Sequence, residues 1–171
     1  MNNEFTETWL LDFTDPGAAA GWLETGDMPA GELRILVGES AEESEKPYHE
    51  DSFLGRTLAQ IVRSVPTVLS GGSVHLELDA TEIHISRVDS AEGVEIQQKI
   101  PDIREENQPY ESIRIGTDAY ATEIYRSVDE WRTITDRTYP ALSESEWYRD
   151  LSNALDAAQA AMEQEGIEVP E

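Results

Sequence analysis

Residues 73–97 read SVHLELDATEIHISRVDSAEGVEIQ, and this stretch decides the fold because polar and apolar side chains alternate along it. Strict alternation over four or more residues is typical of a β-strand with one buried face. It occurs over residues 74–78, 83–86 and 94–97, and the polar segments between these runs are short. The stretch therefore predicts an antiparallel meander. Its first hairpin directs five apolar side chains to the core, namely Val74, Leu76, Leu78, Ile83 and Ile85.

A helix is predicted immediately upstream of the meander. Apolar residues recur every three or four positions from Phe53 to Val65, which is the spacing of one helical face. Asp51 or Ser52 is expected to cap the first turn, because short oxygen-bearing side chains accept hydrogen bonds from the free amides there. Pro66 is expected to end the helix, since proline has no N–H to continue the hydrogen-bond ladder.

Two more helices are predicted downstream. Thr117 or Asp118 is expected to cap the first of them. Ser143 and Glu146 have the spacing of a capping box at the start of the second, and Gly166 is a stop signal at its end. The first of these helices carries an apolar stripe of Tyr120, Ile124, Val128, Trp131 and Ile134.

The order of the predicted elements indicates the fold class. Strands are also expected at residues 8–13, 32–37 and 112–115, so helices and strands alternate only in the first half of the chain. Segregation of this kind favours an α+β protein. We expect an antiparallel sheet of four to six strands, with three or four helices packed mainly on one face.

Length and composition suggest one domain. A chain of 171 residues is long enough for one hydrophobic core and short for two, so residues 1–171 are expected to form a single domain. Residues 39–51 hold six carboxylates and are predicted to be an acidic, solvated loop. Residues 167–171 follow the last helix and are predicted to be a loose tail.

The charge balance is the most unusual feature of the composition. Acidic residues number 36 and basic residues 12, which gives a formal net charge of −24. Only Lys46 and Lys99 are lysines, whereas ten residues are arginines. This profile resembles that of proteins from halophilic archaea, which work in molar potassium chloride, where the screening length is about 3 Å. The resemblance implies that monovalent cations solvate the acidic surface and that the fold gains stability in molar salt.

Several function classes lack their sequence signals. There is no cysteine for disulfides or thiolate metal sites, and neither a Gly-x-Ser-x-Gly elbow nor a Gly-Lys-Ser/Thr phosphate loop occurs. A strongly acidic chain is unsuited to direct nucleic-acid binding, which depends on lysine and arginine at phosphates. No stretch approaches 18 apolar residues, and the N-terminus has no basic segment followed by an apolar run. We therefore expect a cytoplasmic protein without membrane contact.

One polar constellation has the residue types of a metal site. If the hairpin turn is two residues long at Ala80-Thr81, Glu77 lies opposite His84, and His75 lies on the same face. Two imidazoles and a carboxylate are suitable ligands for zinc or another divalent ion and leave a position open for water. The alternative is that His75, Glu77 and His84 belong to the ordinary solvent face of an amphipathic hairpin. No other cofactor is expected.

Residues 53–161 resemble the layout of small uncharacterised proteins, including some encoded near polymorphic toxins as immunity proteins. The resemblance lies in a helix (residues 57–62), the break Leu69-Ser70-Gly71-Gly72, a meander, an aromatic-striped helix (residues 120–131) and a final helix beginning Glu146-Trp147. It rests on the order of elements and on no single motif. It implies a protein-binding role and transfers no catalytic residue.

The sequence therefore favours a non-enzymatic, protein-binding domain, of the immunity or antitoxin kind. An exposed aromatic among carboxylates would suit a basic protein partner. Two alternatives remain: a small metal-dependent hydrolase using the His/Glu constellation, and an acidic inhibitor that mimics DNA. The residues expected to bind the partner lie in the acidic loop and are Glu42, Glu43, Glu45, Tyr48 and Glu50.

Overall fold

The computed structural model describes most of the chain from residue 48 onward and two separate strands before it. The described residues are 9–13, 30–37, 48–77, 82–88, 93–99 and 111–171, and side chains are described over 54–77, 82–88, 93–97 and 112–171.

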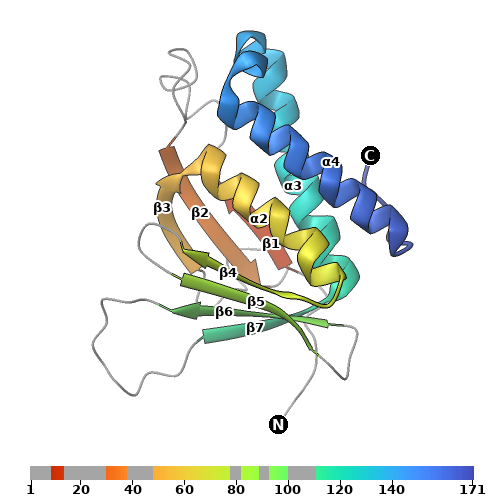
Figure 1. Cartoon of the computed structure of the whole chain (residues 1–171). Coiled ribbons are helices and arrows are strands. Elements are labelled where there is room, and N and C mark those ends of the chain that lie inside the picture. The colour runs from red at the N-terminus through yellow and green to blue at the C-terminus, as the bar shows by residue number, and fades with distance from the viewer. Residues whose placement is uncertain (1–8, 14–29, 38–47, 78–81, 89–92, 100–110) are drawn as a thin grey trace.

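The strands of the described residues form two antiparallel sheets (Figure 1). The first sheet has the order β1-β2-β3, and the second has the order β4-β5-β6-β7, so each strand pairs with its neighbours in sequence. The bounds of the first sheet are β1 Trp9–Phe13, β2 Ala30–Val37 and β3 Tyr48–Phe53. Those of the second are β4 Ser73–Glu77, β5 Glu82–Val88, β6 Gly93–Lys99 and β7 Glu111–Gly116.

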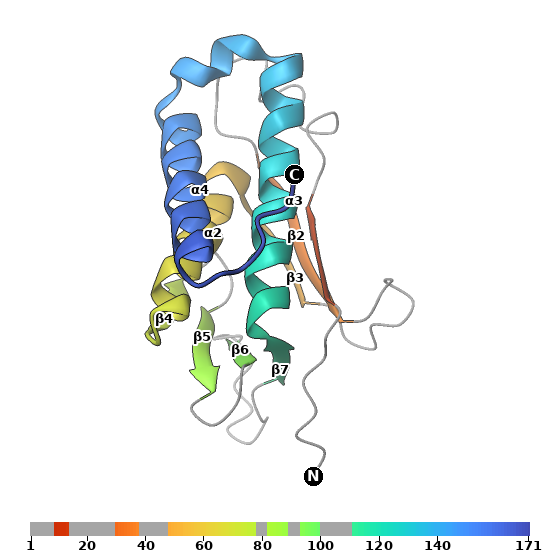
Figure 2. The same ribbon diagram turned by 90° about the vertical axis from the view of Figure 1, so that its right-hand side faces the viewer.

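Helices cover one side of the four-stranded sheet (Figure 2). They are α2 Leu54–Leu69, α3 Thr117–Thr138 and α4 Glu146–Gln164, with a 3-10 turn η1 Pro140–Glu144 between the last two. The α+β class is therefore confirmed, and so is the meander. The described strands nevertheless divide into two sheets, where the sequence predicted one.

The hydrophobic core lies between the four-stranded sheet and the helices. Inward-facing aliphatic side chains of the strands are nearly inaccessible, because they alternate with polar residues that point away. The strand residues of this core are Leu76, Ile83, Ile85, Val94, Ile96 and Ile115. They join a helical set that includes Leu58, Val62, Tyr120, Ile124, Val128, Leu151, Leu155 and Met162.

The start and the end of α2 both differ from the prediction. Residues 48–51, expected within the acidic loop, and Ser52, a predicted cap, belong to β3, and α2 begins at Leu54 directly after it. Pro66 lies inside the helix, which continues to Leu69. A proline removes one ladder hydrogen bond, but burial of Val68 and Leu69 at 0% and 2% exposure offsets that loss.

The predicted caps of α3 and α4 are wrong. Gly116 precedes α3 and Ser145 precedes α4, and neither position has a side-chain capping hydrogen bond. The Ser143 hydroxyl instead donates to the carbonyl of Pro140 at 2.9 Å, inside the 3-10 turn. The predicted stripe of α3 is buried except at its last member, since Ile134 is 39% exposed.

Gly166 ends α4 as predicted. Its φ of 73° lies in the left-handed region that favours glycine. The amides of Gly166 and Ile167 donate to the carbonyls of Glu163 and Met162 at 3.2 and 2.9 Å, which is the Schellman arrangement. The turn brings Ile167 into the core at 8% exposure, and Val169 packs against that core. The prediction of a loose tail over 167–171 is wrong for these two residues.

Candidate metal site

The candidate site lies on the β4–β5 hairpin, on the face of the sheet opposite the helices. The two histidines are direct cross-strand partners, His75 with His84, and Glu77 is the partner of Glu82. The predicted pairing of Glu77 with His84 is therefore wrong by two residues. A shift of two keeps every side chain on its face, so the predicted clustering of the histidines survives the correction.

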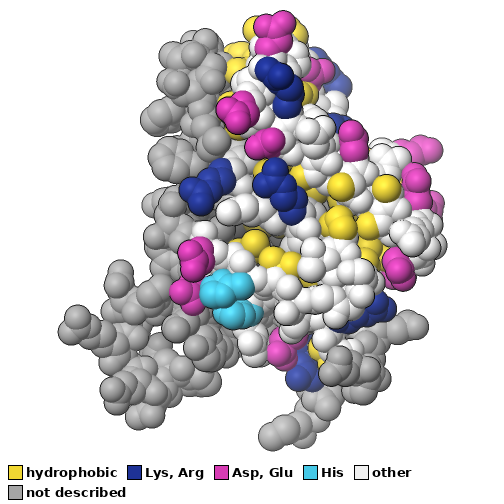
Figure 3. Space-filling model, viewed as in Figure 1, with side chains coloured by type: hydrophobic (Ala, Val, Ile, Leu, Met, Phe, Trp, Pro, Cys, Tyr) yellow, Lys and Arg dark blue, Asp and Glu magenta, His cyan; other side chains and the backbone are white. Residues whose placement is uncertain are grey.

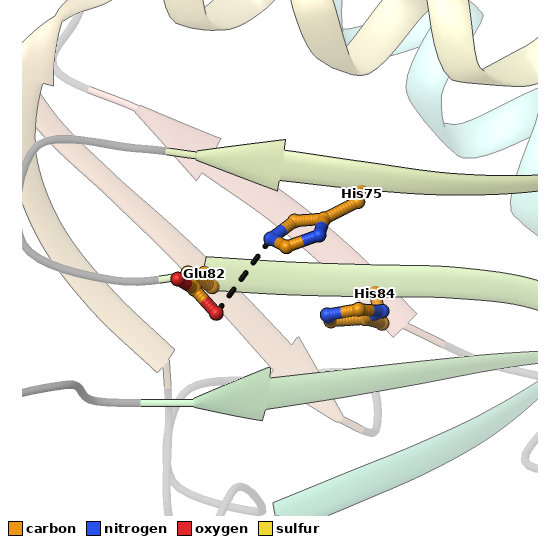
Figure 4. Close-up of side chains that lie close together, drawn as sticks. All are labelled: His75, Glu82 and His84. Atoms are coloured by element: carbon orange, nitrogen blue, oxygen red, sulfur yellow. Dashed lines mark ion pairs between the residues drawn. The ribbon is translucent and has the colours of Figure 1, made fainter.

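Three side chains bring metal-binding atoms together. One ligand atom each from His75, Glu82 and His84 lies within 4.8 Å of the others. The Nε2 atom of His75 is 3.6 Å from Oε2 of Glu82, and the two imidazole centroids are 4.1 Å apart with their planes tilted by 37°. Figure 4 shows both rings and the carboxylate projecting from the same face, with Glu82 directed toward His75.

The site is open to solvent. The side chains of His75 and Glu82 are 43% and 29% exposed, and His84 is exposed as well. In Figure 3 the histidines form a surface patch with acidic side chains beside it. An ion can therefore reach the site without a change in the fold.

The carboxylates of this face also favour a bound cation. Glu77 and Glu82 are directly opposite each other, and like charges in that position destabilise a strand pair. On its other side Glu82 is the cross-strand partner of the basic residue Lys99 of β6. A divalent ion between the imidazoles and Glu82 would add positive charge that offsets this repulsion. Glu77 does not belong to the three-residue group. It is nevertheless the cross-strand partner of Glu82 and lies two residues from His75 on the same face of β4.

The donor set indicates the class of ion. Imidazole nitrogens suit zinc, copper, nickel and iron, whereas calcium and magnesium prefer oxygen ligands alone. Zinc binds nitrogen and carboxylate oxygen at about 2.0–2.2 Å, which places two ligands of a tetrahedral ion about 3.3 Å apart. The 3.6 Å between Nε2 of His75 and Oε2 of Glu82 is close to that separation. The ligand atom of His84 lies within 4.8 Å of the other two, so its side chain would have to rotate toward them to complete the geometry.

Polar residues continue from the histidines across β6 and β7. We call this surface the outer face, because its residues alternate with the buried side chains of the core. The register aligns His84 with Gln97 and Gln97 with Ser112, and it aligns Glu95 with Arg114. The polar residues of the outer face whose side chains are described are Ser73, His75, Glu77, Glu82, His84, Ser86, Glu95, Gln97, Ser112 and Arg114.

Of the five residues predicted to bind a partner, two lie within the described structure. Glu42, Glu43 and Glu45 lie outside the described residues. Tyr48 and Glu50 lie on β3, where their backbones pair with Ile35 and Leu33 of β2. They therefore belong to a strand and not to a loop.

Glu82 is the site residue that the sequence prediction missed. It precedes Ile83 and falls two positions before His84, so the alternation of β5 assigns it to the same face as that histidine. The prediction placed it next to the turn, because a two-residue loop at Ala80-Thr81 was assumed. Alternation alone was enough to predict the face on which Glu82 lies, but not its cross-strand partner.

Comparison of the chain with protein-family models, with curated proteins and with solved structures finds no match in any of the three. Within the described ranges, no helix combines the length and the apolar character that crossing a bilayer requires.

Proposed function

We propose that this chain is a metal-binding domain that takes a divalent first-row transition ion, with zinc as the test ion, through His75, Glu82 and His84. The observation that carries the proposal is the convergence of these three donor side chains within 4.8 Å on one exposed face. Two imidazoles and one carboxylate supply the nitrogen and oxygen ligands that zinc takes in proteins.

Three protein ligands leave one position on a tetrahedral ion. On an exposed face, that position is available to water or to a donor from another molecule. Two of the three functions considered from the sequence can use it: a metal-bound water serves a hydrolase, and a metal-bound side chain serves a protein-binding domain. Hydrolysis, immunity-like protein binding and DNA mimicry stay predictions, as does the salt-adapted origin.

Calorimetric titration with zinc tests the proposal. Because 36 carboxylates can bind cations weakly, the titration is made in excess magnesium, which competes for carboxylates but not for imidazoles. The wild type is expected to bind one zinc ion per chain, and His75→Ala/His84→Ala is expected to bind none at the same concentrations.

The third histidine provides the matched control. His49 lies on β3 in the other sheet, so His49→Ala removes an imidazole while leaving the hairpin unchanged. It is expected to bind zinc like the wild type. The proposal fails if the wild type gives no saturable binding, or if the double variant retains it.

A further inference from the structure

A chain of hydrogen bonds on the outer face leads toward the candidate metal site. Arg114 of β7 donates from Nε to Oε2 of Glu95 at 3.0 Å, and Gln97 of β6 donates from Nε2 to Oε1 of the same carboxylate at 3.0 Å. The Glu95 side chain is only 19% exposed, and Gln97 is half-buried. The carboxylate thus has a fixed partner on each oxygen.

These bonds determine which way the Gln97 amide faces. An ionised carboxylate is only an acceptor, so the NH₂ group of Gln97 must be the end that contacts Glu95. The carbonyl oxygen Oε1 is then the other end of the amide. Gln97 is the direct cross-strand partner of His84, and side chains in that relation lie within reach of each other.

A histidine that binds a metal through one ring nitrogen carries a proton on the other. That N–H needs an acceptor, which fixes the tautomer and the orientation of the ring. We propose that Gln97 positions the imidazole of His84 by accepting its second ring N–H through Oε1, with Glu95 and Arg114 holding the amide in place. This role rests on the metal site proposed above.

The hydrogen bonds of Glu95 join β7 to β6, and the proposed contact would extend this polar chain to β5. Arg114 offsets the charge of Glu95, so the carboxylate orients Gln97 without adding a full negative charge beside the metal ligands. Through the proposed contact, Gln97 fixes the orientation of the His84 imidazole on β5, the strand that also carries Glu82. Residues of this kind alter metal affinity by about 10–100-fold when they are replaced.

The test compares two substitutions of Gln97 by zinc calorimetry. Gln97→Leu keeps the size of the side chain but has no acceptor, and it is expected to weaken zinc binding by at least about tenfold. Gln97→Glu keeps acceptor oxygens but cannot donate to Glu95, whose carboxylate it repels, so it is expected to weaken zinc binding less than Gln97→Leu does. Ser112→Ala is the control, because Ser112 is the cross-strand partner of Gln97 on β7, and this variant is expected to bind zinc with wild-type affinity.

A second measurement separates positioning from a general structural effect. Nitrogen-15 NMR of the metal-free protein reports the tautomer of each imidazole. We expect one tautomer for His84 in the wild type and a mixture of both in Gln97→Leu, with His75 unchanged. Wild-type zinc affinity in Gln97→Leu overturns the inference, and so does an unchanged His84 tautomer.

The two proposals fail in different ways. If the wild type does not bind zinc, the proposed function is wrong, and the tautomer comparison still tests the contact between Gln97 and His84. If the wild type binds zinc and Gln97→Leu binds it equally well, only the role of Gln97 is wrong.

Discussion

The two faces of the four-stranded sheet are formed by alternate residues of the same strands, and they have different roles. On the inner face, Ile83, Ile85 and Ile96 are at most 4% exposed and belong to one core with the helices. On the outer face, the neighbouring residues are polar, and His75 and His84 are exposed. A strand with a period of two thus separates the residues that hold the fold from those available for a ligand.

The largest expected difference between the faces is in stability. Ile83→Ala removes a side chain that is 2% exposed, and we expect it to lower the free energy of unfolding by about 2–5 kcal/mol. The next residue gives the matched comparison, because His84→Ala changes the exposed face of the same strand. Its expected cost in the metal-free protein is below about 0.5 kcal/mol. Urea denaturation measures both, and equal losses would contradict the division between the faces.

A smaller effect tests the interior through its pH dependence. Tyr120 is fully buried on α3, its hydroxyl is hydrogen-bonded to Ser64 of α2, and burial raises the pKa of Tyr120 above its ordinary value. Because the folded-state pKa exceeds the unfolded one, the contribution is complete below about pH 10 and is lost as the pH rises further. We expect Tyr120 to account for about 1.4 kcal/mol of lost stability per pH unit above that point.

Tyr120→Phe removes the titrating hydroxyl. The free energy of unfolding of this variant is expected to fall less steeply with alkaline pH, although its stability at neutral pH is lower by about 1–3 kcal/mol. Burial also raises the pKa of Tyr125 and of Tyr148, so the free energy of unfolding of both proteins still falls somewhat at alkaline pH. Parallel stability curves for the wild type and the variant would show that Tyr120 does not contribute.

The smallest effect compares two carboxylates within the outer face. Glu82 belongs to the group of three donors and Glu77 does not, although the two are cross-strand partners. We expect Glu82→Gln to weaken zinc binding by about tenfold, or 1.4 kcal/mol. Glu77→Gln changes the net charge equally and is expected to have a smaller effect. Equal affinities for the two variants would mean that charge, and not coordination, decides binding.

Much of the fold followed from periodicity. The alternation of residues 74–78, 83–86 and 94–97 predicted the meander, and the helical spacing predicted the buried face of α2 and most of that of α3. These signals are strong because one face of each element must be buried. The strand β3 was missed because its sequence, YHEDSF, is polar and has no regular alternation. Its pairing with β2 is a tertiary effect that local pattern does not encode.

The sequence predicted which face of the sheet carries the candidate site, but not the register that pairs β4 with β5. Alternation assigns His75 and His84 to one side, whereas a shift of two residues leaves that assignment unchanged. The pattern therefore could not decide whether Glu77 or Glu82 stands beside the imidazoles. Gln97 was missed for a related reason, since its relation to His84 depends on the pairing of β5 with β6.

The attachment of the donors to paired strands has an entropic consequence. The donors that meet at the candidate site stand on backbones already held by neighbouring strands, and the opposite side of those strands is packed in the core. Little conformational freedom remains to be lost when an ion arrives, so metal uptake need not be coupled to folding. In contrast to a zinc finger, the apoprotein is expected to be folded with its donor side chains already on one face, and the ion would dissociate without unfolding the chain.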